Sequence, residues 1–133
     1  MEDRTNPAHY KDEAVCVDGK RYEPIDICEC YNFCLGNAIK YIIRAKHHSD
    51  GCKVNYLKAL WYLTRLKAQD SLGYSEIYPE GDGRFKVPAL LEEYRKRFKL
   101  LELLLDEVGK VSLISIDDAI ELLNQRISEL QDE

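Results

Sequence analysis

Apolar residues recur at alternating steps of three and four along most of the chain, and this spacing constrains the fold more than any other feature. It places apolar side chains on one side of an α-helix. The segments with this spacing are 35–46, 53–69, 91–108 and 116–130. A shorter helix over 24–32 can begin at Pro24. Neither an internal repeat nor a β-rich run accompanies them. We therefore predict an all-α fold, a compact helical domain with an N-terminal arm over residues 1–24 and a C-terminal helical hairpin.

The pattern divides this one domain into two regions, residues 1–88 and residues 89–133. The first region contains the arm, the first helices and a long connector over 71–88, whose Gly and Pro residues break any helix. In the second region Gly109 ends one predicted helix, and Ser115 is a suitable N-cap for the next. We expect the second region to form the helical hairpin.

The C-terminal helices carry two apolar seams, Leu91–Val108 and Ile116–Leu130, each two heptads long. That length is too short for a stable free coiled coil. Because residues 25–68 already supply a candidate core, we expect one small domain not to bury both seams. Exposed seams mark an interface, so we predict a homo-oligomer held partly by residues 89–133. The alternative is a hairpin that folds back on the first helices.

Polar residues follow one stripe on each of the predicted helices 35–46 and 53–69. These residues are Asn37, Lys40, Tyr41 and Arg44 on the first helix, and Lys58, Tyr62, Arg65 and Gln69 on the second. The expected buried side of the second helix is Val54, Leu57, Leu60, Trp61, Leu63 (or Thr64) and Ala68. Two helices joined by a short turn pack side by side, so we expect the polar stripes to converge on one cleft. Cations around aromatic rings suit a phosphate group plus a flat base.

Charge is unevenly distributed along this acidic chain, whose formal net charge is −5. Residues 37–67 carry seven basic side chains and a single acidic one, which suggests a local anion site, the alternative being a solvated helix surface. The net charge argues against general DNA binding. No apolar run approaches the roughly 20 residues that a membrane helix needs. Because no signal peptide is visible either, we expect the protein in the cytoplasm.

Neither the cysteines nor a glycine-rich phosphate-binding loop indicates the function of this chain. Five cysteines are an odd number for a disulfide framework, and Cys28, Cys30 and Cys34 match no zinc motif. We expect all five to be reduced and structural, with no bound metal. Neither GxxxxGK[ST] nor GxGxxG occurs, so a phosphate ligand would depend on side-chain cations.

Four blocks in the first half resemble a known family. They are Asn6-Pro7-Ala8-His9-Tyr10, Glu23-Pro24-Ile25-Asp26, the run from Leu35 to Ala45 (LGNAIKYIIRA), and the run from Leu57 to Leu63 (LKALWYL). In order and spacing they are similar to a family of small phage-encoded proteins, which includes a podovirus nucleotide kinase without a Walker motif. The resemblance covers roughly residues 6–66, so the C-terminal third lies outside it.

The resemblance implies a helical nucleotide-binding protein that phosphorylates deoxynucleoside monophosphates, often in a multi-subunit assembly. The matching positions are His9, Tyr10, Asn37, Lys40, Tyr41, Arg44, Lys58, Trp61 and Tyr62. Two departures stand out. The segment after Ala45, usually rich in Lys and Gly, reads KHHSDG here, and Tyr56 stands where the family has an acidic residue.

Two functions from different classes fit these observations. The first is a kinase in the cytoplasm of an infected host cell, with a nucleoside triphosphate as phosphate donor and a magnesium requirement that the sequence leaves open. Its catalytic residues are His9, Lys40 and Arg44, and its substrate-binding residues are Tyr10, Asn37, Tyr41, Lys58, Tyr62 and Arg65. The second is a phage protein that sequesters a nucleotide, or binds a host protein, without turnover. Tyr56 in place of a carboxylate and the lack of a magnesium-binding acidic pair favour the second.

Overall fold

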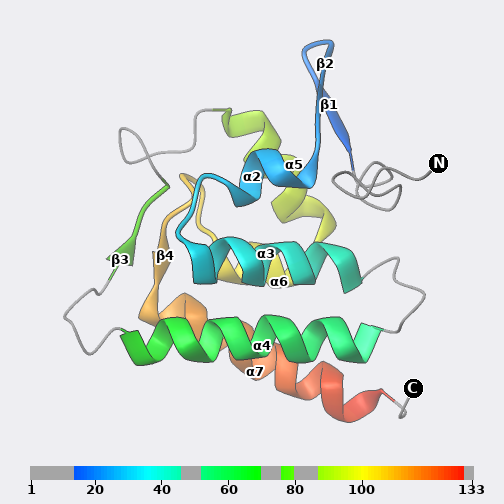
Figure 1. Ribbon diagram of the computed structural model, residues 1–133. Coiled ribbons are helices and arrows are strands. Elements are labelled where there is room, and N and C mark those ends of the chain that lie inside the picture. The colour runs from blue at the N-terminus through cyan, green and yellow to red at the C-terminus, as the bar shows by residue number, and fades with distance from the viewer. Residues whose placement is uncertain (1–13, 46–51, 70–75, 80–86, 131–133) are drawn as a thin grey trace.

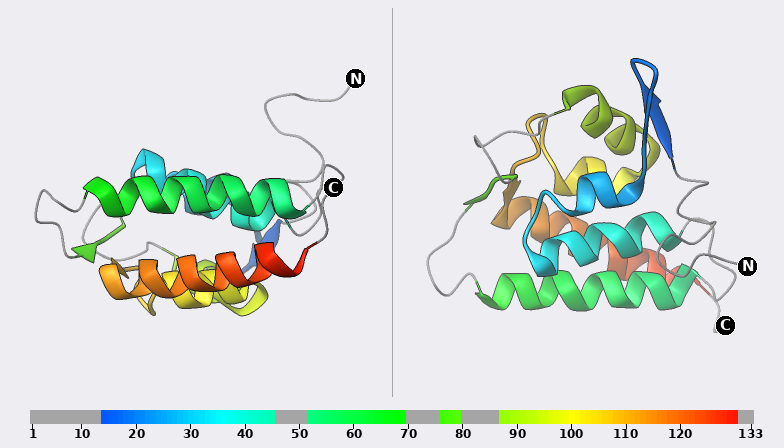
Figure 2. Two further views of the ribbon diagram at one scale, coloured as in Figure 1. Left: turned by 90° about the horizontal axis from the view of Figure 1, so that it is seen from below. Right: turned by 45° about the horizontal axis from the view of Figure 1, so that its top comes forward.

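The computed structural model describes residues 14–45, 52–69, 76–79 and 87–130, and in these ranges six helices form two layers (Figures 1 and 2). One layer contains α2 (Pro24–Cys28), α3 (Phe33–Ala45) and α4 (Cys52–Gln69). The other contains α5 (Pro88–Arg97), α6 (Lys99–Leu104) and α7 (Leu113–Glu129). The prediction of a mainly helical fold is confirmed. None of the helices in these ranges is long and apolar enough to cross a membrane.

Two short antiparallel ladders make the strict all-α prediction wrong in detail. Strands β1 (Val15–Val17) and β2 (Lys20–Tyr22) form a hairpin within the predicted arm. Its two-residue turn, Asp18-Gly19, has φ values of 52° and 79°, the positive pair that a type I′ turn requires. Strand β3 (Glu76–Ile77), in the predicted connector, pairs with β4 (Val111–Ser112). The Asp-Gly pair was the available signal for the hairpin.

Helix α3 has the burial that its spacing predicts. Its buried side chains are Leu35, Ala38, Ile39, Ile42, Ile43 and Ala45. Gly36 allows α2 to pack directly on α3, because a Cβ at this position would lie 2.7 Å from the backbone oxygen of Cys28. α2 itself ends at Cys28, four residues before the predicted end. The helix is thus covered by α2 on one side and α4 on another.

Helix α4 turns a different side inward from the predicted one. Asn55, Ala59, Leu63 and Leu66 are its buried residues. Of the residues predicted to be buried, Leu63 is buried, whereas Val54, Leu57, Trp61 and Ala68 are exposed. Both sets follow helical spacing. Packing against α3 and α7 buries the set that begins with Asn55. The prediction of Trp61 as a core residue is therefore wrong.

The predicted helix over 91–108 is broken at Phe98, which has an extended backbone (φ −127°, ψ 110°) between α5 and α6. Leu100, Leu101, Leu104 and Leu105 are all buried on one side of the following segment. Phe98 is buried as well, stacked on Tyr94 with ring centroids 6.4 Å apart.

The second predicted helix of the hairpin begins three residues early. Ser112, and not Ser115, is the N-cap of α7. The two serines form a capping box, in which the backbone N–H of each donates to the hydroxyl of the other, at 3.1 and 2.9 Å. Val111 is buried just before this cap, so the β4 pairing sets where the helix starts.

The apolar seams of the last third are mostly inside the chain's own core. Their buried members are Leu91, Tyr94, Phe98, Leu101, Leu105, Ile116 and Leu123. α7 packs on both α4 and α6, so the hairpin folds back on the first helices. The expectation that one small domain leaves the seams exposed is wrong, so the seams no longer support homo-oligomerisation, which now rests on the resemblance alone.

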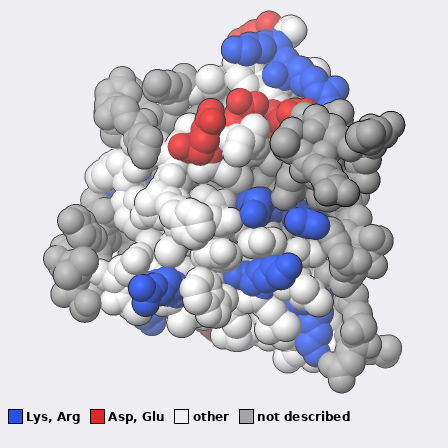
Figure 3. All heavy atoms as spheres, in the orientation of Figure 1, with Lys and Arg blue, Asp and Glu red and all other residues white. Residues whose placement is uncertain are grey.

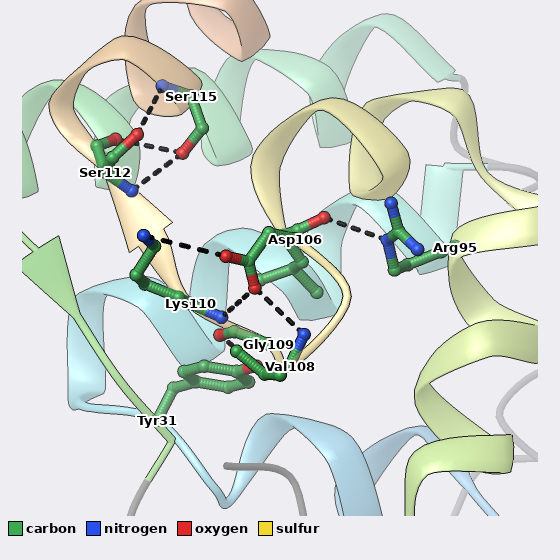
Figure 4. Close-up of polar contacts among 9 residues, drawn as sticks. Tyr31, Arg95, Asp106, Val108, Gly109, Lys110, Ser112 and Ser115 are labelled. Carbon is green, nitrogen blue, oxygen red and sulfur yellow. Dashed lines mark hydrogen bonds and ion pairs between the residues drawn. The ribbon is translucent and has the colours of Figure 1, made fainter. Parts of the chain in front are cut away.

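A buried hydrogen bond joins the two layers at the loop that leads into β4 (Figure 4). The Tyr31 hydroxyl donates to the backbone oxygen of Gly109 at 2.8 Å. Burial raises the pKa of Tyr31 well above its usual range, so the hydroxyl keeps its proton. Asp106 holds the same loop, because one of its carboxylate oxygens accepts from the N–H groups of Val108 and Lys110 at 3.0 and 2.8 Å.

We predict that Gly109→Ala lowers the free energy of unfolding by about 2–4 kcal/mol, through backbone strain at φ +87° and a clash with Tyr31. A Cβ at Gly109 would lie 2.6 Å from the Tyr31 hydroxyl oxygen, whereas one at Gly19 (φ +79°) meets nothing within 4 Å. Gly19→Ala is therefore the control for strain alone and should cost about 1–2 kcal/mol. Urea unfolding measures both.

Tyr31→Phe removes the oxygen that the new Cβ would meet. The double variant Tyr31→Phe/Gly109→Ala should therefore lose about 1 kcal/mol less than the sum of the two single variants. If the losses in unfolding free energy of the two single variants simply add up in the double variant, the clash with Tyr31 is not what destabilises Gly109→Ala.

Candidate functional site

Helices α3 and α4 lie side by side and bring one tyrosine each to the same place. The rings of Tyr41 and Tyr62 are stacked, with centroids 5.9 Å apart and planes 11° from parallel. Both side chains are half-buried, so the pair lies at the protein surface and not in the core. The two predicted polar stripes therefore do meet.

Two lysines lie close to the ring of Tyr41. The ammonium nitrogen of Lys40 is 4.5 Å from the ring centroid, and that of Lys58 is 5.2 Å from it. The negative face of an aromatic ring attracts each cation. The two positive charges also repel each other, and a bound anion would offset this repulsion.

Exposed aromatic rings extend the surface around Tyr62. Trp61 is 61% exposed and Phe33 is 74% exposed. Both meet Tyr62 edge to face, with ring centroids 5.0 and 6.0 Å away. An exposed flat ring held by its neighbours is a stacking surface for a base. We call the group the aromatic–lysine cluster: Phe33, Lys40, Tyr41, Lys58, Trp61 and Tyr62.

The other predicted site residues have different positions. Asn37 uses its amide to donate to the backbone oxygen of Phe33 at 2.8 Å, within its own helix. Arg44 is half-buried in the last turn of α3, one turn beyond Lys40, and Arg65 is exposed on α4, one turn beyond Trp61. His9 and Tyr10 lie outside the described residues.

Charge on this side of the molecule is separated between helices, as Figure 3 shows. Basic side chains are spread along α3 and α4 with uncharged ones between them, and acidic side chains gather around α2. The cations do not surround a single cleft there, contrary to the prediction. An anionic ligand would lie on the α3–α4 part of this face, away from the carboxylates of α2.

Cys28 lies close behind this face. Burial of its thiol raises its pKa to about 12, and the charge of Lys40 partly opposes the shift. The positive charge of Lys40 thus acts on α2 as well as on the cluster. All five cysteines lie among the described residues and carry free thiols. Where the chain is described, no three His, Cys, Asp or Glu side chains come together in a way that could hold a metal ion.

Tyr56, the position at which the resembling family has an acidic residue, is not part of the cluster. Residues two apart on a helix point to nearly opposite sides, so Tyr56 faces away from Lys58. Its hydroxyl accepts a hydrogen bond from Arg126 of α7 at 3.3 Å. Sequence reasoning missed this contact because 70 residues separate the partners. It also missed Phe33, whose only signal is an aromatic residue at the first position of a helix.

The first half of the chain matches a family model. Residues 4–64 match the family described as protein of unknown function (DUF3310). This span includes all four blocks on which the resemblance rests, as well as α2, α3 and most of α4. No curated protein and no solved structure matches the chain. The match supports a place in an uncharacterised family for this span and assigns no activity to it.

The raised pKa of Cys28 predicts low thiol reactivity. Because the thiolate is the reactive form, Cys28 should be alkylated far more slowly than the exposed Cys16 at every pH between 7 and 9. In Lys40→Gln the opposing positive charge is lost, the pKa rises further, and Cys28 should become slower still. Mass spectrometry of peptides after timed iodoacetamide treatment measures each rate. Equal rates for Cys28 and Cys16 in the folded protein would contradict the prediction.

Proposed function

We propose that the α3–α4 face binds a nucleotide, and that the protein transfers phosphate from a nucleoside triphosphate to a (deoxy)nucleoside monophosphate without a Walker motif. One observation carries the binding part of the proposal. The aromatic–lysine cluster places two ammonium groups near one ring and two exposed aromatic rings beside its stacked partner. This pairing of charge with flat apolar surface fits a phosphate joined to a base.

In this proposal the lysines bind phosphate and the aromatic rings bind the base. Phosphoryl transfer depends on positioning and on neutralising charge more than on covalent chemistry. Lys40 and Lys58 would neutralise phosphate oxygens, with Arg44 one turn further along α3. Trp61 and Phe33 would stack on the base. His9, on the arm, is proposed as the acid–base group at the acceptor or leaving oxygen.

Sequestration of a nucleotide without turnover is the second candidate. Its sequence arguments are the tyrosine at position 56 in place of a carboxylate and the lack of an acidic pair that could bind magnesium. Because Tyr56 faces away from Lys58 and contacts Arg126, a carboxylate at that position would also point away from the cluster. The first argument therefore does not weigh against the kinase, which we propose first, and the second is tested by the turnover assay below. The phage origin, the cytoplasm of an infected host cell and a homo-oligomeric state belong to the same proposal.

The single tryptophan of the chain gives a direct test of binding. A base stacked on Trp61 should quench its fluorescence, so we expect saturable quenching with one or more of the four deoxynucleoside monophosphates. Lys58→Gln should raise the dissociation constant about tenfold, equivalent to about 1.4 kcal/mol, through loss of a charge-assisted hydrogen bond. Lys67→Gln is the matched control, because Lys67 is on the same helix and pairs with Asp117 at 2.6 Å.

If Lys58→Gln and Lys67→Gln bind equally well, the ligand does not lie on the cluster. Turnover needs a separate assay, in which each monophosphate is incubated with ATP and the diphosphate product is separated by chromatography. The kinase proposal predicts product, and less of it with Lys40→Gln or Arg44→Gln. Quenching without any product would favour sequestration.

A further inference from the structure

Three basic side chains line a pocket between the two helix layers. Its volume is about 310 Å³, near the lower end for small-molecule sites. We call it the interlayer pocket, and its lining residues are Ile42, Tyr56, Arg97, Phe98, Lys99, Leu100 and Arg126. They come from α3, α4, α7 and the junction between α5 and α6. No member of the aromatic–lysine cluster lines it.

The polar side chains of this pocket are all hydrogen-bond donors. Arg97, Lys99 and Arg126 are cations, and no Asp or Glu is among the lining residues. The Tyr56 hydroxyl oxygen accepts from Arg126 at 3.3 Å, which leaves the hydroxyl proton for another partner. A ligand that satisfies these groups must therefore bring acceptors, and a negative charge fits them best.

The three cations differ in how far the protein itself offsets their charge. Arg97 pairs with Glu93 at 3.7 Å, and Lys99 pairs with Glu102 at 2.7 Å, so each has a carboxylate on its own helix. The hydrogen bond from Arg126 goes to a neutral hydroxyl instead, so it does not offset the charge. Arg126 is half-buried and lines the pocket. Of the three cations, it is therefore the one whose charge a bound anion would stabilise most.

We propose that the interlayer pocket binds a small molecule through its phosphate group. Arg126, Arg97 and the Tyr56 hydroxyl hold the phosphate oxygens, with Lys99 at the exposed edge. The buried side chains of Ile42, Phe98 and Leu100 form an apolar wall for the rest of the molecule. The proposal is independent of the proposed function, because it concerns other residues and a different side of α4.

A ligand in this pocket would contact both layers at once. Tyr56 belongs to the first layer, whereas Arg97 and Arg126 belong to the second. Binding to the folded state alone raises its apparent stability in proportion to the logarithm of ligand concentration. Phosphate should therefore raise the melting temperature of the intact protein more than sodium chloride of equal ionic strength does.

The decisive experiment follows the arginine side-chain Nε–Hε signals by NMR while inorganic phosphate, AMP or adenosine is added to the full chain. Phosphate and AMP should shift the signals of Arg97 and Arg126, and adenosine should leave them in place. Arg126→Gln and Arg97→Gln should each weaken phosphate binding about tenfold or more. Lys96→Gln is the matched control, since Lys96 is exposed beside Arg97 and does not line the pocket.

Tyr56→Phe keeps the ring and removes only the hydroxyl, so it tests the site even if an arginine variant unfolds. It should weaken phosphate binding about threefold to tenfold. Lys58→Gln should change nothing at these arginine signals, which separates this pocket from the aromatic–lysine cluster. Adenosine shifts equal to those of AMP would overturn the proposal, as would parental affinity in Arg126→Gln.

Discussion

The burial of α3 on most of its sides is the constraint on which the rest of the molecule depends. Gly36 brings α2 against it, Ala38 and Ile39 are fully buried, and α4 and α6 cover other parts of it. Phe33 and the stripe of Asn37, Lys40, Tyr41 and Arg44 reach the surface. Because the helix cannot rotate without exposing its apolar residues, Lys40 and Tyr41 are held in one position. A binding surface built on such a helix needs little ordering when a ligand arrives.

The two-layer arrangement gives α4 two different roles. Toward α3 and solvent it presents Lys58, Trp61 and Tyr62, and toward α7 it presents Tyr56. The cationic segment of this otherwise acidic chain supplies both lysines of the aromatic–lysine cluster, whereas the cations of the interlayer pocket come from α5, α6 and α7. Charges that are near one another along α4 still point to different sides of the helix, since Lys58 lies at the ring of Tyr41 and Lys67 pairs with Asp117 of α7. The positive charge of residues 37–67 is therefore not gathered in one site.

How far the site could be predicted varies from residue to residue. The meeting of Tyr41 with Tyr62, and of Lys40 and Lys58 with Tyr41, follows from stripes that are visible in the sequence and from the packing of neighbouring helices. The exposure of Trp61 could not be predicted in this way. Helix α4 carries apolar residues at helical spacing on two sides, and the set with the buried Asn55 looks the more polar of the two. Only the contacts with α3 and α7 decide between them.

The sequence by itself determined the helical class, the burial of α3 and the cationic character of its pairing with α4. It could do so because helical periodicity and charge are local properties that any window of the chain displays. The tertiary structure alone decided the break at Phe98, the internal burial of the C-terminal seams, and the contact of Arg126 with Tyr56. Each of these depends on residues far apart in the chain competing for the same buried space. Packing against specific partners decides which of these residues are buried, and local residue spacing does not identify those partners.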